Sequence, residues 1–208
     1  MRKLGVVITL LAVSCLACGP LKRFAYEGFS RDSWQQPERV IEALGLEPGD
    51  RVADLGAGSG YFTLHLAQAV GPTGKVYAVD VDEEMNDHLR KRVDEAGLDN
   101  VEVILGEFED PLLPDGEIDL LLTVNTYHHI QERPSYFRAV QADLASDGRV
   151  AIVDFDGRKG WLVRLMVHSV PKQEMVGEMR EAGYRLDQDL DFLERQSFLI
   201  FSVEKKKR

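Results

Sequence analysis

The strongest signal in the sequence is the stretch Val52-Ala53-Asp54-Leu55-Gly56-Ala57-Gly58-Ser59-Gly60-Tyr61. A short apolar run ends in an acid, and glycine then occupies every second position up to Gly60. This order predicts a buried strand that turns sharply into a helix. Because glycine has no Cβ, a ligand can approach the backbone of such a turn closely. The stretch therefore predicts a ligand-binding turn between a strand and a helix.

Strands and helices alternate along the rest of the chain. Apolar runs predict strands at 51–55, 75–80, 101–106, 118–124 and 149–154, and helical patterns predict helices at 33–44, 60–70, 83–96, 134–145 and 171–182. Two further strand-like segments, 184–191 and 196–204, follow each other so closely that they can pair only in antiparallel fashion. The alternation predicts an α/β fold, a Rossmann-like doubly wound sheet of five parallel strands with a C-terminal antiparallel hairpin.

The glycine pattern distinguishes two families of nucleotide-binding fold. The dinucleotide motif G-x-G-x-x-G requires glycine where this chain has Tyr61, so Tyr61 and the terminal hairpin disfavour a nicotinamide oxidoreductase. The order acid-x-G-x-G-x-G instead resembles motif I of the class I S-adenosylmethionine (SAM)-dependent methyltransferases. The resemblance covers residues 34–203 and implies the seven-stranded fold of that class. It also implies SAM as cofactor and methyl transfer by in-line displacement.

The length of 208 residues fits one domain, expected at 33–204 after a linker at 19–32 and before a basic tail at 205–208. The formal net charge of −10 argues against a nucleic-acid partner, since such proteins carry a basic face. The expected methyl acceptor is therefore a small molecule.

The first 18 residues differ from the body of the chain. Arg2 and Lys3 precede an apolar stretch that ends in small residues and two cysteines, Cys15 and Cys18. This pattern resembles a bacterial lipoprotein signal, and Cys15 fits the lipidation position better than Cys18. We expect a periplasmic or membrane-anchored protein, with the cytoplasmic face left open. The body has no cysteine, which excludes thiol-based chemistry such as that of arsenite-methylating enzymes.

Four residues around the first strand are expected to hold the cofactor. The resemblance implies that Asp54 holds the methionine moiety and that Gly56, Gly58 and Gly60 form the loop beneath it. The alternatives without a ligand are that Asp54 caps a helix or turn and that the three glycines form an ordinary tight turn.

Residues after the second, third and fourth strands complete the expected cofactor site. Asp80 can accept hydrogen bonds from both ribose hydroxyls, and Val81 beside it would pack on adenine. The resemblance implies that Glu107, or the next backbone amide, reads the adenine edge; the alternative for Glu107 is a solvated loop acid. Phe108 stacks on adenine or, the favoured interpretation, covers the core. The resemblance also implies that Asn125 contacts the methionine end.

The segment 125–130 is rich in polar and aromatic residues directly after an apolar strand. His128 or His129 can accept a proton near neutral pH and is the candidate general base. Alternatively, one histidine packs against or caps the next helix and the other lies in solvent. His65 and His88 are expected to be packing or surface residues, and His168 is a candidate for the acceptor pocket.

No histidines and carboxylates have metal-ligand spacing, so no metal is expected. The acceptor pocket is expected to form from the leading helix, the segment 125–130 and the segment 156–171. The competing function is an exported lipoprotein that keeps the fold as a non-catalytic nucleoside- or metabolite-binding module.

Overall fold

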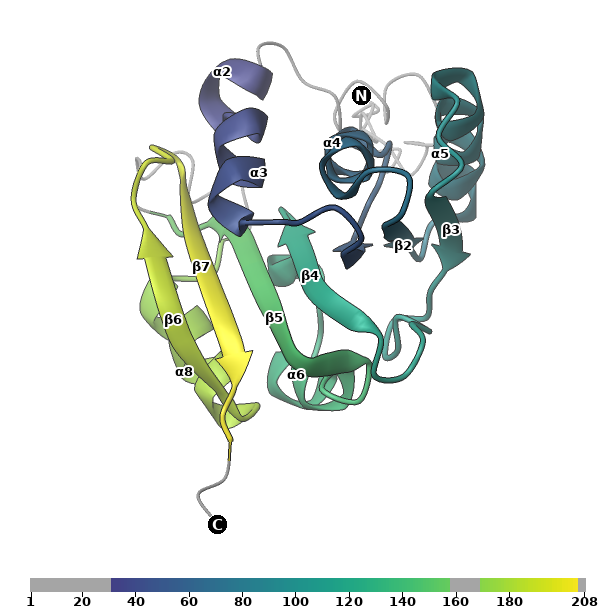
Figure 1. The fold of residues 1–208 in the computed structure, drawn as a ribbon. Coiled ribbons are helices and arrows are strands. Elements are labelled where there is room, and N and C mark those ends of the chain that lie inside the picture. Colours follow the sequence, from purple (N-terminus) through teal and green to yellow (C-terminus); the bar gives the residue numbers. More distant parts are fainter. Residues whose placement is uncertain (1–30, 158–168, 206–208) are drawn as a thin grey trace, which may run out of the picture.

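The computed structural model of the protein describes residues 31–157 and 169–205. Their centre is a seven-stranded sheet with the strand order β3-β2-β1-β4-β5-β7-β6 (Figure 1). The strands are β1 (Arg51–Leu55), β2 (Lys75–Asp80), β3 (Val101–Leu105), β4 (Ile118–Val124), β5 (Leu144–Phe155), β6 (Tyr184–Leu190) and β7 (Gln196–Val203).

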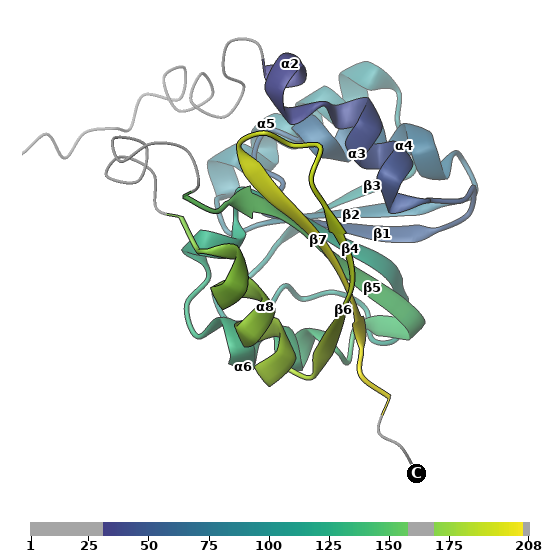
Figure 2. The same cartoon turned by 90° about the vertical axis from the view of Figure 1, so that its left-hand side faces the viewer.

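The first five strands pair in parallel, and β7 pairs antiparallel with both β5 and β6. Figure 2 shows this hairpin crossing in front of the parallel part of the sheet. The predicted fold class, a doubly wound sheet with a terminal antiparallel hairpin, is confirmed.

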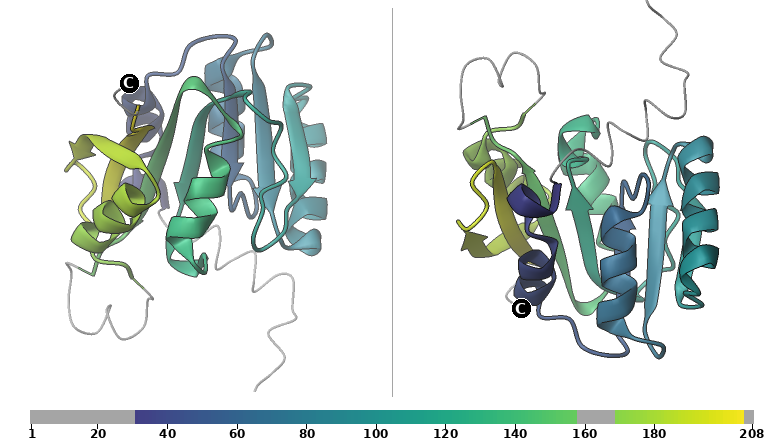
Figure 3. Two further views of the ribbon diagram at one scale, coloured as in Figure 1. Left: turned by 90° about the horizontal axis from the view of Figure 1, so that it is seen from below. Right: turned by 90° about the horizontal axis from the view of Figure 1, so that it is seen from above.

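Helices cover both faces of the sheet, as Figure 3 shows from two sides. One face carries α3 (Pro37–Leu44), α4 (Tyr61–Val70) and α5 (Glu83–Ala96), and the other carries α6 (Arg133–Val140) and α8 (Lys172–Glu181). The short α2 (Arg31–Gln35) precedes α3, and the 3-10 turn η1 (Tyr127–His129) follows β4.

The core is divided by the sheet because successive side chains of a strand point to opposite faces. In β1, Ala53 and Leu55 pack with α6 and α8, whereas Val52 packs with α3 and α4. Asp54 shares the side of Val52 and meets α4, so this acid is placed at the junction of sheet and helix. The fold thus positions the end of β1 for chemistry.

The predicted helix 33–44 is two helices, which corrects the expectation. Gln36 adopts a left-handed backbone with φ 48°, and Pro37 is the first residue of α3. Proline disfavours the helical conformation of the residue before it and is well suited to the first helical position. The break turns α2 away from the line of α3 at the residue before the proline.

The predicted helix 134–145 is too long. It ends at Val140, and Leu144 instead pairs with Ile118 across an irregularity in the sheet, which lengthens the predicted strand 149–154 into β5. Sheet pairing therefore overrides the helical propensity of Ala145.

Some expectations fall outside the described residues: the leader 1–18, most of the linker, His168 and the last three residues. Within 31–157 and 169–205, no helix combines the length and the apolar character that a membrane crossing requires.

Candidate active site

The candidate site lies where the order of strands reverses. The chain leaves β1 toward β2 on one side and later returns to β4 on its other side. Ligands of open α/β sheets bind at the carboxyl ends of strands at such a point. Four polar residues that end or follow strands gather there: Asp54, Asp80, Asn125 and Asp154.

The glycine loop is fastened to the end of β2. The backbone N–H groups of Gly56 and Ala57 both donate to the carbonyl of Val79, at 2.8 and 3.0 Å. Gly56 has φ +77°, and a Cβ on it would lie 2.0 Å from the Thr126 hydroxyl. Glycine is therefore required here, both by the backbone conformation and by the approach of the β4 loop.

Asp80 holds the middle of the glycine loop. Its Oδ2 accepts from the N–H of Gly58 at 2.8 Å, and its Oδ1 accepts from the N–H of Asp82 at 3.0 Å. Burial raises the pKa of Asp80, and these two N–H groups oppose that shift. A carboxylate has about four acceptor sites, so each oxygen keeps capacity for a hydroxyl. Asp80 therefore fits the expected role of holding a ribose.

Asp54 is almost fully buried, with 2% exposure, and accepts a hydrogen bond from the Thr63 hydroxyl at 2.6 Å. Burial raises the pKa of Asp54 to about 6, while Thr63 and the positive charge of Arg31 act in the opposite direction. A desolvated carboxyl gains much from a cationic ligand, because pairing replaces lost hydration. Asp54 therefore fits a bound ammonium group.

The side expected to face adenine is open. Val81 is 44% exposed and Phe108 is 75% exposed, and Glu107 is exposed as well. The favoured interpretation of Phe108 as a core residue is wrong, because this residue in the loop after β3 is exposed to solvent.

Asn125 belongs to a buried polar chain that the sequence did not predict. Its Oδ1 accepts from Nε2 of Gln196 at 2.6 Å, and Oε1 of Gln196 accepts from Nε2 of Gln35 at 3.2 Å. Gln35 in turn accepts from Nε of Arg31. Both glutamines are fully buried. The chain joins α2, β7 and the end of β4.

His128 is paired with an acid. Its Nδ1 lies 2.7 Å from Oδ1 of Asp154, which is fully buried, and its backbone N–H donates to Oδ2 at 3.1 Å. A carboxylate at Nδ1 fixes the proton there and leaves Nε2 as the basic nitrogen. His129 is exposed, with its ring centroid 4.0 Å from that of His128. The two predicted histidines therefore differ in their surroundings and exposure.

Asp154 is not among the site residues predicted from the sequence, although an acid near the end of a predicted strand is the same signal as Asp54 and Asp80. His65 and His88 lie partly buried on α4 and α5, away from this pairing. The described parts of the chain hold no group of three or more His, Cys, Asp or Glu residues that could bind a metal ion.

A family model described as "Methyltransferase domain" matches residues 46–191, which include the glycine loop and every strand up to β6. The chain belongs to this family. The enzyme class expected from the glycine loop is thereby confirmed, with SAM as its cofactor.

Three similar proteins illustrate the relationship. A solved SAM-dependent methyltransferase from Aquifex aeolicus is 27% identical, with 89% of this chain and 99% of that chain covered and a TM-score of 0.79. A protein-L-isoaspartate O-methyltransferase from Ignicoccus hospitalis is 31% identical over 70% of this chain and 65% of its own length. A ubiquinone/menaquinone biosynthesis C-methyltransferase from Ectopseudomonas mendocina is 29% identical over 56% of this chain. Only 46% of that relative's length is covered.

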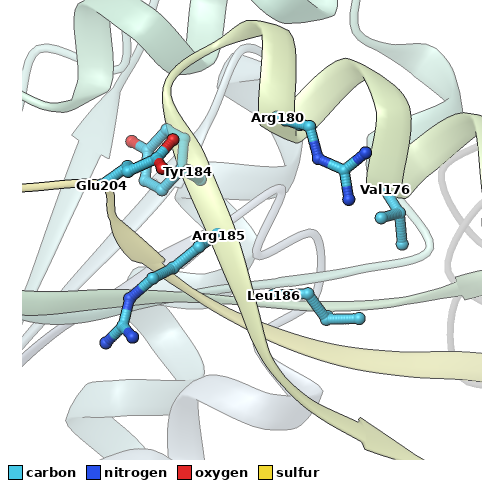
Figure 4. Close-up of a pocket in the computed structure, with 6 residues that line it drawn as sticks. All are labelled: Val176, Arg180, Tyr184, Arg185, Leu186 and Glu204. Atoms are coloured by element: carbon cyan, nitrogen blue, oxygen red, sulfur yellow. The ribbon is translucent and has the colours of Figure 1, made fainter.

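A hollow elsewhere on the methyltransferase domain is not part of this site. It is lined by six residues of α8, β6 and the segment after β7, drawn in Figure 4: Val176, Arg180, Tyr184, Arg185, Leu186 and Glu204. Tyr184 of β6 pairs with Val203 of β7, and the neighbouring Ser202 of β7 pairs with Arg149 of β5. Arg149 lies near the start of the part of β5 that pairs in parallel with β4. The hollow thus lies toward the amino ends of the parallel strands, opposite the candidate site.

The close approach of Gly56 and Thr126 predicts a specific loss of ligand binding. Gly56→Ala forces the glycine loop and the β4 loop apart, and we expect at least tenfold weaker binding of S-adenosylhomocysteine in calorimetry. Gly45→Ala is the matched control, since Gly45 has φ +60° but open space where its Cβ would lie. Both variants lose about 1 kcal/mol of stability to the left-handed backbone. Equal affinities in the two variants would contradict the assignment.

Burial of Asp54 predicts an unusual dependence of stability on pH. Between pH 4 and 6 the unfolded chain ionises Asp54 before the folded protein does, so stability falls as pH rises. Above about pH 6 the full cost is present. Asp54→Asn removes that cost and can still accept from Thr63. We expect it to raise the free energy of unfolding by about 1–3 kcal/mol at pH 7.5 but not at pH 4.

Urea denaturation at both pH values measures this difference. Asp99→Asn, at an exposed position, is the control and should change stability little at either pH. A similar gain for Asp54→Asn at both pH values would exclude the ionisation of Asp54 as its cause.

Proposed function

We propose that the protein transfers a methyl group from SAM to a small-molecule acceptor by in-line displacement. The observation that carries this proposal is the pair of acids at the ends of β1 and β2, one on each side of the glycine loop. Asp54 is buried, and a buried carboxylate favours pairing with a cation such as an ammonium group. Asp80 accepts a hydrogen bond from the N–H of Gly58 in the glycine loop. SAM supplies an electrophilic methyl on a sulfonium, so the protein contributes mainly alignment and proximity.

The individual cofactor contacts follow from this placement. Asp80 accepts the ribose hydroxyls, and Asp54 takes the amino group of the methionine moiety. Val81 and Phe108 pack on adenine from their exposed positions, and Glu107 receives the exocyclic amine. Asn125 lies by the methionine end, held by Gln196. The family match and the geometry support these roles.

We assign the general base to His128 rather than His129. Asp154 orients the His128 ring through Nδ1 and stabilises the imidazolium that forms when Nε2 takes a proton. His129 is exposed to solvent, whereas the His128 ring is held against a fully buried carboxylate. A nucleophile such as an amine needs no base, whereas a hydroxyl does. The proposed acceptor is therefore a small molecule with a weakly acidic hydroxyl group. Either this hydroxyl is itself methylated, or it is conjugated to the carbon atom that is methylated.

The names of two relatives show that the methyl acceptor differs among similar proteins. One is named for C-methylation in quinone biosynthesis and another for O-methylation of protein isoaspartate. The first is compatible with the hydroxylated acceptor proposed here. The non-catalytic binding module is not favoured, because a module that only binds has no use for a histidine paired with a buried acid.

We also propose that residues 1–18 act as a lipoprotein-type leader, with Cys15 or Cys18 lipidated, and attach the enzyme to a membrane. This assignment rests on the sequence pattern of the leader alone.

Calorimetric titration of the protein with SAM, S-adenosylhomocysteine and NAD tests the cofactor assignment. We expect micromolar dissociation constants for both sulfur nucleosides and no binding of NAD. Asp80→Ala should weaken them at least 100-fold, because both ribose hydroxyls lose their acceptor. Asp82→Ala is the control: Asp82 caps α5 by accepting from Glu84 and Met85, so its loss lowers stability by about 1 kcal/mol and leaves affinity unchanged. NAD binding, or unchanged affinity in Asp80→Ala, would refute the proposal.

Release of S-adenosylhomocysteine with a panel of phenols, quinols and carboxylic acids tests the base. With an acceptor that is turned over, His128→Ala should lower the rate about 100-fold or more and leave SAM affinity unchanged. His129→Ala removes the neighbouring ring and should cost less than threefold. A greater loss in His129→Ala would transfer the role to that residue.

A further inference from the structure

The 3-10 turn η1, which carries His128, is held from two sides. On one side, Asp154 binds both the ring and the backbone N–H of His128. On the other side, Tyr127 is fully buried in the core, where its ring stacks on Phe137 of α6 with centroids 5.4 Å apart. The Tyr127 hydroxyl donates to Oε2 of Glu178 on α8 at 2.8 Å. The turn is therefore fixed to two helices as well as to the sheet.

Arg133 on α6 completes this second set of contacts. Its Nε donates to Oε2 of Glu178 at 2.8 Å, and its Nη2 donates to Oε1 at 2.7 Å, so the pair is bidentate. The guanidinium carbon of Arg133 lies 5.3 Å from the ring centroid of Tyr127. Its Nη1 also makes a long hydrogen bond, 3.5 Å, to the carbonyl of Ile130, the residue after η1. Arg133 thus contacts both the start and the end of the turn. We call Tyr127, Arg133 and Glu178 the η1 clamp.

The η1 clamp has the features of a rigid contact. The side chains of Arg133 and Glu178 are each only 19% exposed. Burial acts to raise the pKa of Glu178, but the hydrogen bonds from Arg133 and Tyr127 outweigh it, and the pKa is lowered. Glu178 is therefore ionised at neutral pH, and charge-assisted bonds of this kind hold a defined geometry. Helices α6 and α8 lie side by side on one face of the sheet (Figure 2), so the clamp joins η1 to both.

We propose that Glu178 is a positioning residue, which holds His128 in register with Asp154 by fixing Tyr127. This inference rests on the proposed function, in which His128 is the base, and deepens it. The turn η1 has only three residues, so its place depends mainly on what binds it. Nδ1 of His128 lies 2.7 Å from Oδ1 of Asp154, and a shift of about 1 Å would break this hydrogen bond. With the clamp intact, the proton stays on Nδ1 and Nε2 stays basic.

The competing explanation is structural. The η1 clamp would then serve only to give the buried Tyr127 hydroxyl an acceptor and to join α6 to α8. Its loss would lower the stability of the protein and leave the His128 ring as it is in the folded state. A positioning role also changes which ring nitrogen of His128 carries the proton.

The test is a long-range ¹H–¹⁵N spectrum of the histidine side chains in the full chain, which requires no methyl acceptor. His128→Ala identifies the signals of His128. At pH 8.5 we expect the unaltered protein to show the Nδ1–H tautomer of His128 alone. Glu178→Ala removes the acceptor that Tyr127 and Arg133 share, and should give a mixture of both tautomers. Glu178→Gln can still accept from Tyr127 and should restore most of the Nδ1–H form.

Two control variants separate this effect from general destabilisation. Glu174→Ala removes the other carboxylate near Arg133, 3.4 Å from Nη2 and also on α8, and should leave the His128 signals unchanged. Tyr184→Phe is matched to Tyr127→Phe, because Tyr184 is buried in the same core and its hydroxyl donates at 2.8 Å to a carbonyl of α6. Both phenylalanine variants should unfold at a lower urea concentration, but only Tyr127→Phe should alter the His128 ring.

Rates give a second measurement for an acceptor that is turned over. Glu178→Ala should lower kcat about tenfold and leave the KM of SAM unchanged, because only the base is misplaced. In a His128→Ala background the same substitution should have no further effect, since no ring remains to be positioned. A full tenfold loss in that background would overturn the positioning role.

The spectra decide between the remaining outcomes. Unchanged His128 signals in folded Glu178→Ala, or equal changes in Tyr127→Phe and Tyr184→Phe, overturn the role of Glu178 and leave the proposed function standing. If Glu178→Ala does not fold, the two phenylalanine variants decide alone. A mixture of tautomers in Glu178→Ala, together with an unchanged rate in His128→Ala, overturns the assignment of His128 as the base instead.

Discussion

The structure depends on the close approach of three backbone segments at the end of β1. The N–H groups of Gly56 and Ala57 share the carbonyl of Val79, and the Thr126 hydroxyl occupies the place where a Cβ of Gly56 would be. This contact brings the ends of β2 and β4 onto the glycine loop. Without it, Asp80 could not reach the N–H of Gly58, and the acids of neighbouring strands would not share one site. The absence of a Cβ on Gly56 therefore allows these three segments to come together at the site.

A second set of contacts joins the opposite side of the site to the beginning of the domain. Side-chain amides run from α2 through β7 to Asn125, with Gln35 and Gln196 fully buried. A half-satisfied buried network costs more than an apolar one, so such a chain specifies one arrangement of α2 over the sheet. The antiparallel hairpin thus has a function beyond completing the sheet. Through Gln196 it sets where the N-terminal helix, and with it Arg31, lies relative to the glycine loop.

Local signals were sufficient for much of the fold. Helix α5 begins and ends where its Asp82 cap and the left-handed Gly97 place it, and β1, β2 and β4 follow apolar runs that need no knowledge of their partners. The residues at strand ends that face the site were likewise recognisable by type. What the sequence could not predict depends on contacts between distant residues. Gln35 and Gln196 are 161 positions apart, and neither is unusual until they meet. The start of β5 at Leu144 depends in the same way on Ile118 across the sheet.

The site also concentrates features that cost stability. Among the described residues, four non-glycine residues have positive φ, and two of them, Gln36 and Asn125, are tied to the candidate site through hydrogen bonds to β7 or its preceding loop. Asp54 adds a carboxyl whose burial is unfavourable once it is ionised. Such costs persist when the surrounding structure holds them in place, and they are common where a ligand recovers part of them. An ammonium group bound to Asp54 would do so, because it gives the buried carboxylate the partner that water no longer provides. The buried carboxylate at the end of β1 is therefore suited to pair with the positive charge of a ligand.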